Sequence, residues 1–226
     1  MLTALFKLLQ PELEMVRQRL IKESLMQGRP LPGLTWPVLN HFDQDFLPAL
    51  VLLSAHTQGY FGPRALSLAA VFQFIFLASL IHNNVKHEIA LETLVGDYFY
   101  TRFFDLLCRD GNLQFLAPLS QLICRIHLEA ARQQEKVSSP ERLRTREYLA
   151  AAATCLGSQL GQTEARLTQA WQEIGLLLGK LWNGQAVTLK ASQAVERLAP
   201  GTVRELLGQL VIQLNDELPV KRVMAL

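Results

Sequence analysis

The stretch ALSLAAVFQFIFLASLIH, residues 65–82, constrains the fold of this chain more than any other segment. Its apolar side chains recur at helical spacing and cover nearly every face of the helix that they predict. A helix of this kind is buried on all sides, either in the centre of a bundle or in a membrane. Because Gln73 stands in its middle and other segments are apolar enough to cover it, we expect a core helix and no membrane span.

Helical periodicity extends along almost the whole chain, and convincing period-two runs are hard to find. Breaks fall at turn sequences such as TQGYFGP (57–63), RDGN (109–112) and APG (199–201). We therefore predict an all-α, single-domain fold over residues 1–226, because no linker is long or polar enough to demand a second domain. The predicted helices cover residues 3–27, 38–56, 64–83, 88–108, 112–134, 140–160, 163–181 and 191–215, with Ser139 before Pro140 as an N-cap.

Charge and cysteine content exclude several classes of protein. A net charge of +2 gives no reason to expect nucleic acid as a partner. The cysteines Cys108, Cys124 and Cys155 are odd in number and far apart, which is neither a disulfide framework nor a CxxC metal site. We expect them to be buried small apolar residues in a reducing cytoplasm, and the N-terminus shows no signal-peptide pattern.

The inventory of chemical groups points to no familiar reaction. No Gly-rich phosphate loop and no nucleophile elbow are present, and the five histidines form no zinc-binding pattern. The six aspartates include no adjacent pair, and none lies between Asp110 and Asp216. A magnesium diphosphate site needs clustered oxygen ligands. Composition and spacing therefore predict only a helical bundle, with an aromatic-rich segment at 98–104 that serves either core packing or a subunit interface.

More specific information comes from ASLIHNNVKHEIALETLVGDYFYTRFFDLL, residues 78–107. This segment resembles the trans-prenyl diphosphate synthases, whose signature ASLIHDDxxD is followed by a VLAGDYL-like helix. Downstream, residues 148–182 resemble the family's K-T helix and its YGxxLGxAFQ helix. The resemblance covers roughly residues 35–185 and implies an antiparallel helical bundle of the isoprenoid-synthase type, truncated in its C-terminal part.

The chain departs from the family where the family binds metal and diphosphate. Asparagines and a histidine replace the aspartates of the first motif, and small apolar residues replace those of the second. The basic residues of the family's GGKR-x-RP segment are also lost. The residues at these three places are Asn83, Asn84 and His87, then Ala186 and Val187, then Gln44, Asp45 and Leu47.

These losses imply a chain that is inactive alone. Ionisation of an allylic diphosphate places negative charge on the leaving group, which the family stabilises with Mg²⁺ and basic side chains. Asparagine is a weaker magnesium ligand than a carboxylate, and Lys86 adds a repelling charge within the first motif. We therefore expect no metal or other cofactor on this chain, and Mg²⁺ on a separate catalytic subunit.

The resemblance implies a non-catalytic small subunit of a heteromeric hexaprenyl or heptaprenyl diphosphate synthase, which supplies menaquinone side chains. The family dimerises through its GDY helix, so a large catalytic subunit is the expected partner, with a homodimer as an option for the isolated chain. The alternative is a helical protein that binds isoprenoid without chemistry. The expected interface residues are Gly96, Asp97, Tyr98, Arg102 and Phe103, and the expected chain tunnel is lined by Phe74, Ala78 and Ser79.

Overall fold

The computed structural model describes residues 4–25, 29, 37, 39–83, 89–135, 143–161, 164–187 and 189–216. All regular structure in these ranges is helical, which confirms the predicted fold class. The elements are α1 (Ala4–Leu8), α2 (Gln10–Glu23), α3 (His41–Thr57), α4 (Pro63–Asn83), α5 (Ile89–Arg109), the 3-10 turn η1 (Leu113–Phe115), α6 (Leu116–Glu135), α7 (Thr145–Ser158), α8 (Ala165–Trp182), α9 (Leu189–Glu196) and α10 (Thr202–Asp216).

Helix α4 forms the centre of the bundle, as its sequence predicts. It packs against α2, α3, α5, α6 and α7, and its three phenylalanines are buried. By length and composition α4 could cross a membrane, but 78% of its most apolar window is covered by the rest of the protein. Burial on all sides explains why this helix needs no polar face.

Helices α3, α7 and α8 pack closely where glycines remove the side chain between two backbones. A Cβ atom on Gly179 of α8 would lie 2.6 Å from the Cα atom of Glu147 on α7. A Cβ atom on Gly157 of α7 would lie 2.7 Å from the carbonyl oxygen of Val51 on α3. Real Cβ atoms do not approach other atoms this closely, so these positions require glycine.

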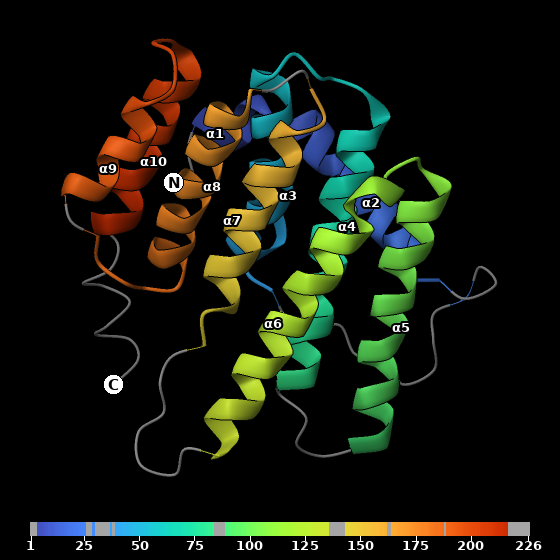
Figure 1. Cartoon of the computed structure of the whole chain (residues 1–226). Helices are drawn as coiled ribbons and strands as arrows, with labels where there is room; N and C mark the ends of the chain where they lie inside the picture. The colour runs from blue at the N-terminus through green and yellow to red at the C-terminus, as the bar shows by residue number, and fades with distance from the viewer. Residues whose placement is uncertain are drawn as a thin grey trace.

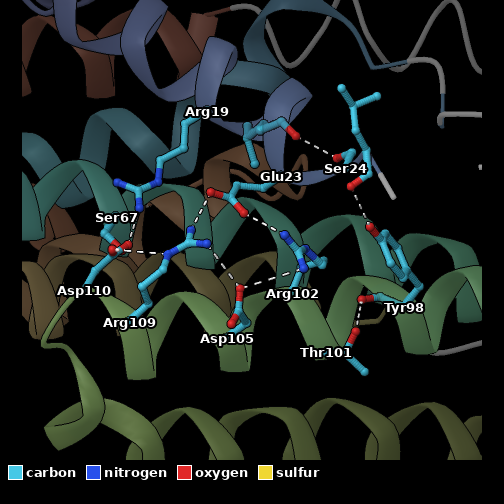
Figure 2. Close-up of polar contacts among 12 residues, drawn as sticks. Arg19, Glu23, Ser24, Ser67, Tyr98, Thr101, Arg102, Asp105, Arg109 and Asp110 are labelled. Atoms are coloured by element: carbon cyan, nitrogen blue, oxygen red, sulfur yellow. Dashed lines mark hydrogen bonds and ion pairs between the residues drawn. The ribbon is translucent and has the colours of Figure 1, made fainter. Parts of the chain in front are cut away.

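Helix α2 is fixed to α5 by a network of ion pairs (Figure 2). The Glu23 carboxylate is almost buried and accepts hydrogen bonds from Arg102, at 2.7 Å, and from Arg109. Next to it, Asp110 binds Arg19 and accepts a hydrogen bond from the Ser67 hydroxyl at 2.7 Å. Residues from α2, α4 and α5 thereby join on one side of the bundle.

The predicted helix boundaries fail at three places. The helix predicted for 3–27 is interrupted at Leu9, because Pro11 starts a new helix rather than continuing one. The helix predicted for 191–215 is two helices, α9 and α10, separated by the APG turn at 199–201. The helix predicted from 140 begins at Thr145, and its expected cap, Ser139 and Pro140, lies outside the described residues.

The expectation of buried cysteines is wrong for two of the three. Cys108 on α5 and Cys124 on α6 are exposed, and Cys155 on α7 is half-buried. The two exposed thiols belong to α5 and α6, the helices drawn in green and yellow-green in Figure 1. A small side chain contributes little to a periodic pattern, so the sequence does not reveal the face on which it lies.

Candidate functional site

Four helices, α3, α4, α7 and α8, meet around Asp43, at the end of the bundle where the resemblance implies diphosphate binding. Asp43, in the first turn of α3, accepts a hydrogen bond from the indole nitrogen of Trp182 on α8 at 2.6 Å. Arg146 of α7 lies 3.3 Å from the same carboxylate and 5.0 Å from the centre of the Trp182 ring. The Gln73 amide of α4 donates to the Asp43 carbonyl oxygen at 3.1 Å. Asp43 therefore already has a positively charged partner, Arg146. We call the end of the bundle around Asp43, Arg146 and Trp182 the mouth.

The three residues at the lost diphosphate-binding segment are also occupied within the chain. Asp45 is nearly buried and receives two hydrogen bonds from the Arg17 guanidinium, at 2.9 and 2.8 Å. The hydrogen bond from Arg17 to Asp45 is the main cause of a raised pKa of Arg17. Gln44 donates to the Leu39 carbonyl oxygen at 3.1 Å, and Leu47 is fully buried. The segment serves packing and ties α3 to α2.

The positions of the second aspartate motif follow the end of α8. Ala186 is exposed and Val187 is half-buried, and neither side chain offers an oxygen ligand. Just before them, the Gln185 amide donates to the buried Glu147 carboxylate at 2.7 Å, and the Arg144 guanidinium donates to it at 2.9 Å. The Glu147 carboxylate is thus already engaged, and Glu173, which lines the same pocket as Ala186 and Val187, pairs with Arg197.

The first aspartate motif is only partly described. Asn83 is the last residue of α4 and is half-buried, whereas Asn84 and His87 lie outside the described residues. Asn83 follows Gln73 by ten residues, or about 15 Å along the helix. In the part of the chain that the structure describes, no group of three or more His, Cys, Asp or Glu side chains is placed to hold a metal ion. The described residues therefore do not fit the Mg²⁺ that the family's chemistry requires.

A polar cluster that the sequence analysis did not predict lies next to Asn83, one turn back along α4. The Tyr100 hydroxyl of α5 lies 2.7 Å from Nε2 of His127 on α6 and 3.4 Å from the Ser79 hydroxyl. The His82 ring stacks on the Tyr100 ring and lies 3.4 Å from Asp97. Burial raises the pKa of Tyr100 and lowers that of His127, whose pKa is lowered further by the nearby His82. The cluster joins α4, α5 and α6.

The residues expected to line a chain tunnel are enclosed by the core. Phe74 and Ala78 are fully buried, and the Phe74 ring packs against Phe99 at a centroid distance of 5.6 Å. The Ser79 hydroxyl is buried and donates to the Ile75 carbonyl oxygen of the preceding turn at 2.8 Å. In this conformation all three side chains serve helix packing.

The residues expected at a subunit interface have different environments. Tyr98 donates to the Leu25 carbonyl oxygen at 3.4 Å and Arg102 pairs with Glu23, so both face α2. Phe103 is 7% exposed and belongs to the core. Gly96 is buried beneath the His82 ring, and Asp97 alone of the five is largely exposed.

A neighbouring face of α5 points away from the bundle. It carries Leu94, Asp97, Thr101, Phe104 and Cys108, all of them exposed, at spacings of three and four residues. Leu94 is 66% exposed and Phe104 47%. We call these five residues the α5 outer stripe. Leu94 and Phe104 are ten residues apart on this face, or about 15 Å along the helix.

No known family model matches the chain, but similar proteins and structures do. Octaprenyl diphosphate synthase of Escherichia coli (strain K12) is 28% identical over 157 residues, covering 58% of this chain and 48% of that protein. Component 2 of heptaprenyl diphosphate synthase from Geobacillus stearothermophilus is 25% identical over 187 residues, covering 73% of this chain and 58% of the relative. The chain spans about half the length of the curated relatives it matches.

The fold matches solved structures over nearly the whole chain. A decaprenyl diphosphate synthase from Rhodobacter capsulatus has a TM-score of 0.75 at 17% identity, covering 94% of this chain and 98% of the solved one. A deletion mutant of the heterotetrameric geranyl pyrophosphate synthase from mint has a TM-score of 0.59 at 18% identity, covering 89% of this chain and 98% of the solved one. The bundle is therefore the isoprenoid-synthase fold. In sequence and in fold, the chain is thus similar to the polyprenyl diphosphate synthases.

Proposed function

We propose that this chain is a non-catalytic small subunit of a heteromeric long-chain trans-prenyl diphosphate synthase. With a catalytic large subunit it would make the C30 or C35 polyprenyl diphosphate that is used for menaquinone side chains, in the cytoplasm. The observation that carries the proposal is the pairing of charges at the mouth. Asp43 is held by Arg146 and Trp182, Asp45 by Arg17, and Glu147 by Arg144.

Paired charges of this kind cannot perform the family's reaction. Breaking the carbon–oxygen bond of an allylic diphosphate requires cations that are free to meet the leaving group. Arg17, Arg144 and Arg146 each have a carboxylate partner, and no described carboxylate cluster could recruit Mg²⁺. In the proposed assembly, the catalytic subunit supplies the metal ions and the reaction, and this chain supplies a docking surface.

The α5 outer stripe is the surface that we assign to the catalytic partner. It lies on the GDY helix, through which the family dimerises, and it presents Leu94 and Phe104 to solvent. This refines the interface expected from the sequence: Asp97 stays in it, while Tyr98, Arg102 and Phe103 are engaged inside the chain. Because Leu94 is 66% and Phe104 is 47% exposed, burying what remains of the two side chains is worth about 2–3 kcal/mol. The same stripe could pair two copies of this chain when the partner is absent.

The proposal is tested by reconstitution. We expect no elongation of farnesyl diphosphate with isopentenyl diphosphate by the purified chain, little by the catalytic subunit alone, and long-chain product when the two are mixed. Elongation by this chain alone, lost on Asn83→Ala, would overturn the proposal. The proposal would also be overturned if the catalytic subunit did not bind this chain and made the same product with and without it. The isoprenoid-binding alternative remains a prediction, and tight one-to-one binding of farnesyl diphosphate by the isolated chain would favour it.

A further inference from the structure

A second surface, separate from the α5 outer stripe, has features of a binding site. A groove of about 1,040 Å³ lies between α6 and the start of α7. On α6 its lining forms two rows at four-residue spacing, one through Cys124, Leu128 and Arg132 and the other through Arg125 and Glu129. Rows at this spacing are the ridges between which a second helix packs. Leu128 lies in the middle of the groove and is 57% exposed.

The groove is rich in arginine, and its guanidinium groups are held in place by an aromatic ring. Arg125 lies 4.1 Å and Arg144 lies 5.1 Å from the centre of the Tyr148 ring on α7. Stacking on a ring leaves the edge of a guanidinium group free to donate hydrogen bonds. Arg144 uses part of its edge on Glu147, at 2.9 Å. The Arg125 group is therefore oriented before any ligand arrives.

The negative charge within the groove does not balance the positive charge. Glu129 accepts a hydrogen bond from the backbone N–H of Arg144, at 3.1 Å, and interacts with the Tyr148 hydroxyl. Among the described residues, neither Arg125 nor Arg132 forms an ion pair with a carboxylate. Two guanidinium groups without a carboxylate partner in the described part of the chain thus lie on one helix, seven residues apart, with the exposed Leu128 between them.

We propose that this groove docks an acidic amphipathic helix of a partner protein, with carboxylates on Arg125 and Arg132 and an apolar side chain on Leu128. Seven residues are two helical turns, or about 10 Å, so the docked helix would carry its carboxylates at positions i and i+7. A single phosphate or diphosphate is too short to reach both arginines and has no use for the leucine between them. The proposal goes beyond the function proposed above, because it does not depend on a catalytic subunit.

The test uses the full chain and a fluorescent, alanine-rich helical peptide of about 18 residues. The peptide carries glutamate at i and i+7 with leucine at i+4, and a matched peptide has glutamine in place of both glutamates. We expect one-to-one binding of the acidic peptide by fluorescence anisotropy, weakened by added salt. The protein variant Arg125→Gln with Arg132→Gln should lower the affinity about tenfold or more.

A matched variant separates the groove from net charge. Arg166→Gln with Arg197→Gln removes the same charge from exposed positions on or near α8 and α9, and should change the affinity by no more than about twofold. The cysteines give a second readout, since Cys124 lines the groove and the exposed Cys108 does not. Bound peptide should slow modification of Cys124 by a thiol reagent and leave the rate at Cys108 unchanged.

Several results would overturn the proposal. If both double variants lost affinity equally, the binding would depend on net charge and not on the groove. If the glutamine peptide bound as tightly as the acidic peptide, the carboxylates would not contribute to binding. If the bound peptide did not slow modification of Cys124 by the thiol reagent, the peptide would not lie in the groove. One-to-one binding of inorganic diphosphate that depends on Arg125, without binding of the peptide, would assign the groove to a small anion.

Discussion

Gly96 of α5 lies directly against the imidazole ring of His82 on α4, so that a Cβ atom on Gly96 would be 2.5 Å from Nε2 of His82. The ring occupies the space that any other residue would need, and in that space it stacks on Tyr100 and meets Asp97. The glycine of the GDY sequence thus has a packing role that is independent of any partner.

We expect Gly96→Ala to lower the free energy of unfolding by about 1–3 kcal/mol, because the His82 ring must move and lose its contacts. Urea denaturation followed by circular dichroism measures this change. Gly208→Ala in α10 is the matched control, since a Cβ atom there meets nothing within 4 Å. It should be neutral or stabilise the chain by up to about 1 kcal/mol. Equal losses in both variants would contradict the role assigned to His82.

The α5 outer stripe makes a prediction about association. Leu94→Ser with Phe104→Ser should weaken binding to the catalytic subunit about tenfold or more, because both side chains leave solvent in the proposed complex. The free energy of unfolding of the isolated chain should fall by only about 1–2 kcal/mol, because about half of the Phe104 side chain is already buried. Sedimentation of the mixed subunits measures the binding. Ile212→Ser, which replaces an equally exposed residue of α10, should leave binding intact, and an equal effect there would refute the assignment.

Phe103 provides the opposite case on the same helix. Its ring is 7% exposed, so Phe103→Ala should lower the free energy of unfolding by about 3–5 kcal/mol. Thermal or urea unfolding of the isolated chain measures the loss without any partner. If Phe103→Ala leaves the fold stable and only weakens association, the orientation of α5 described above is wrong.

The polar cluster of α4, α5 and α6 makes stability depend on pH. Burial lowers the pKa of His127 below its ordinary value of 6.5, the His82 imidazole lowers it further, and Asp97 opposes the shift. In the unfolded chain His127 binds a proton as the pH falls through about 6.5, whereas in the folded chain it binds the proton only at a lower pH. Its contribution is therefore complete above that pH and is lost as the pH falls toward the lower pKa of the folded state.

We expect the urea midpoint to fall between about pH 7.5 and pH 5.5, and to fall less in His127→Gln, which keeps a hydrogen-bonding side chain near Tyr100. His41→Gln changes an exposed histidine and serves as the control. A pH dependence that is the same in all three proteins would show that His127 does not titrate differently on folding.

The Arg17–Asp45 pair makes a prediction about the join between α2 and α3. A double-mutant cycle with Arg17→Gln and Asp45→Asn should give a coupling of about 1–3 kcal/mol, because the pair is bidentate and Asp45 is nearly buried. The exposed pair between Arg197 and Glu173 should give less than about 1 kcal/mol in the same cycle. Similar couplings at both sites would argue against a special role for Asp45.

Part of this architecture is readable in the sequence. Helix α4 was predicted within one residue at its start because apolar side chains on all faces leave no other structure for residues 64–83. The family resemblance predicted the fold, since it depends on residue identity and order, while the loss of metal ligands at Ala186 and Val187 stays a prediction.

Other features depend on rotations and distances that a linear pattern does not contain. Phe103 and Phe104 differ by one position, which is about 100° around the helix, and aromatic residues on both sides of α5 hide which one faces inward. The partners of Asp45 and Asp43 come from α2, α7 and α8, so their pairing appears only once the helices are assembled.

The ion-pair network of Figure 2 has a consequence for the order in which the chain folds. Arg19 and Asp110 are 91 residues apart, and Glu23 and Arg109 are 86 apart. During synthesis, Arg19 and Glu23 of α2 cannot pair with Asp110 and Arg109 until α5 has been made. Contacts over such long separations form slowly, because a large loop must close first. The end of α2 that carries Arg19 and Glu23 is thus fixed later than Arg17, whose partner Asp45 is only 28 residues away.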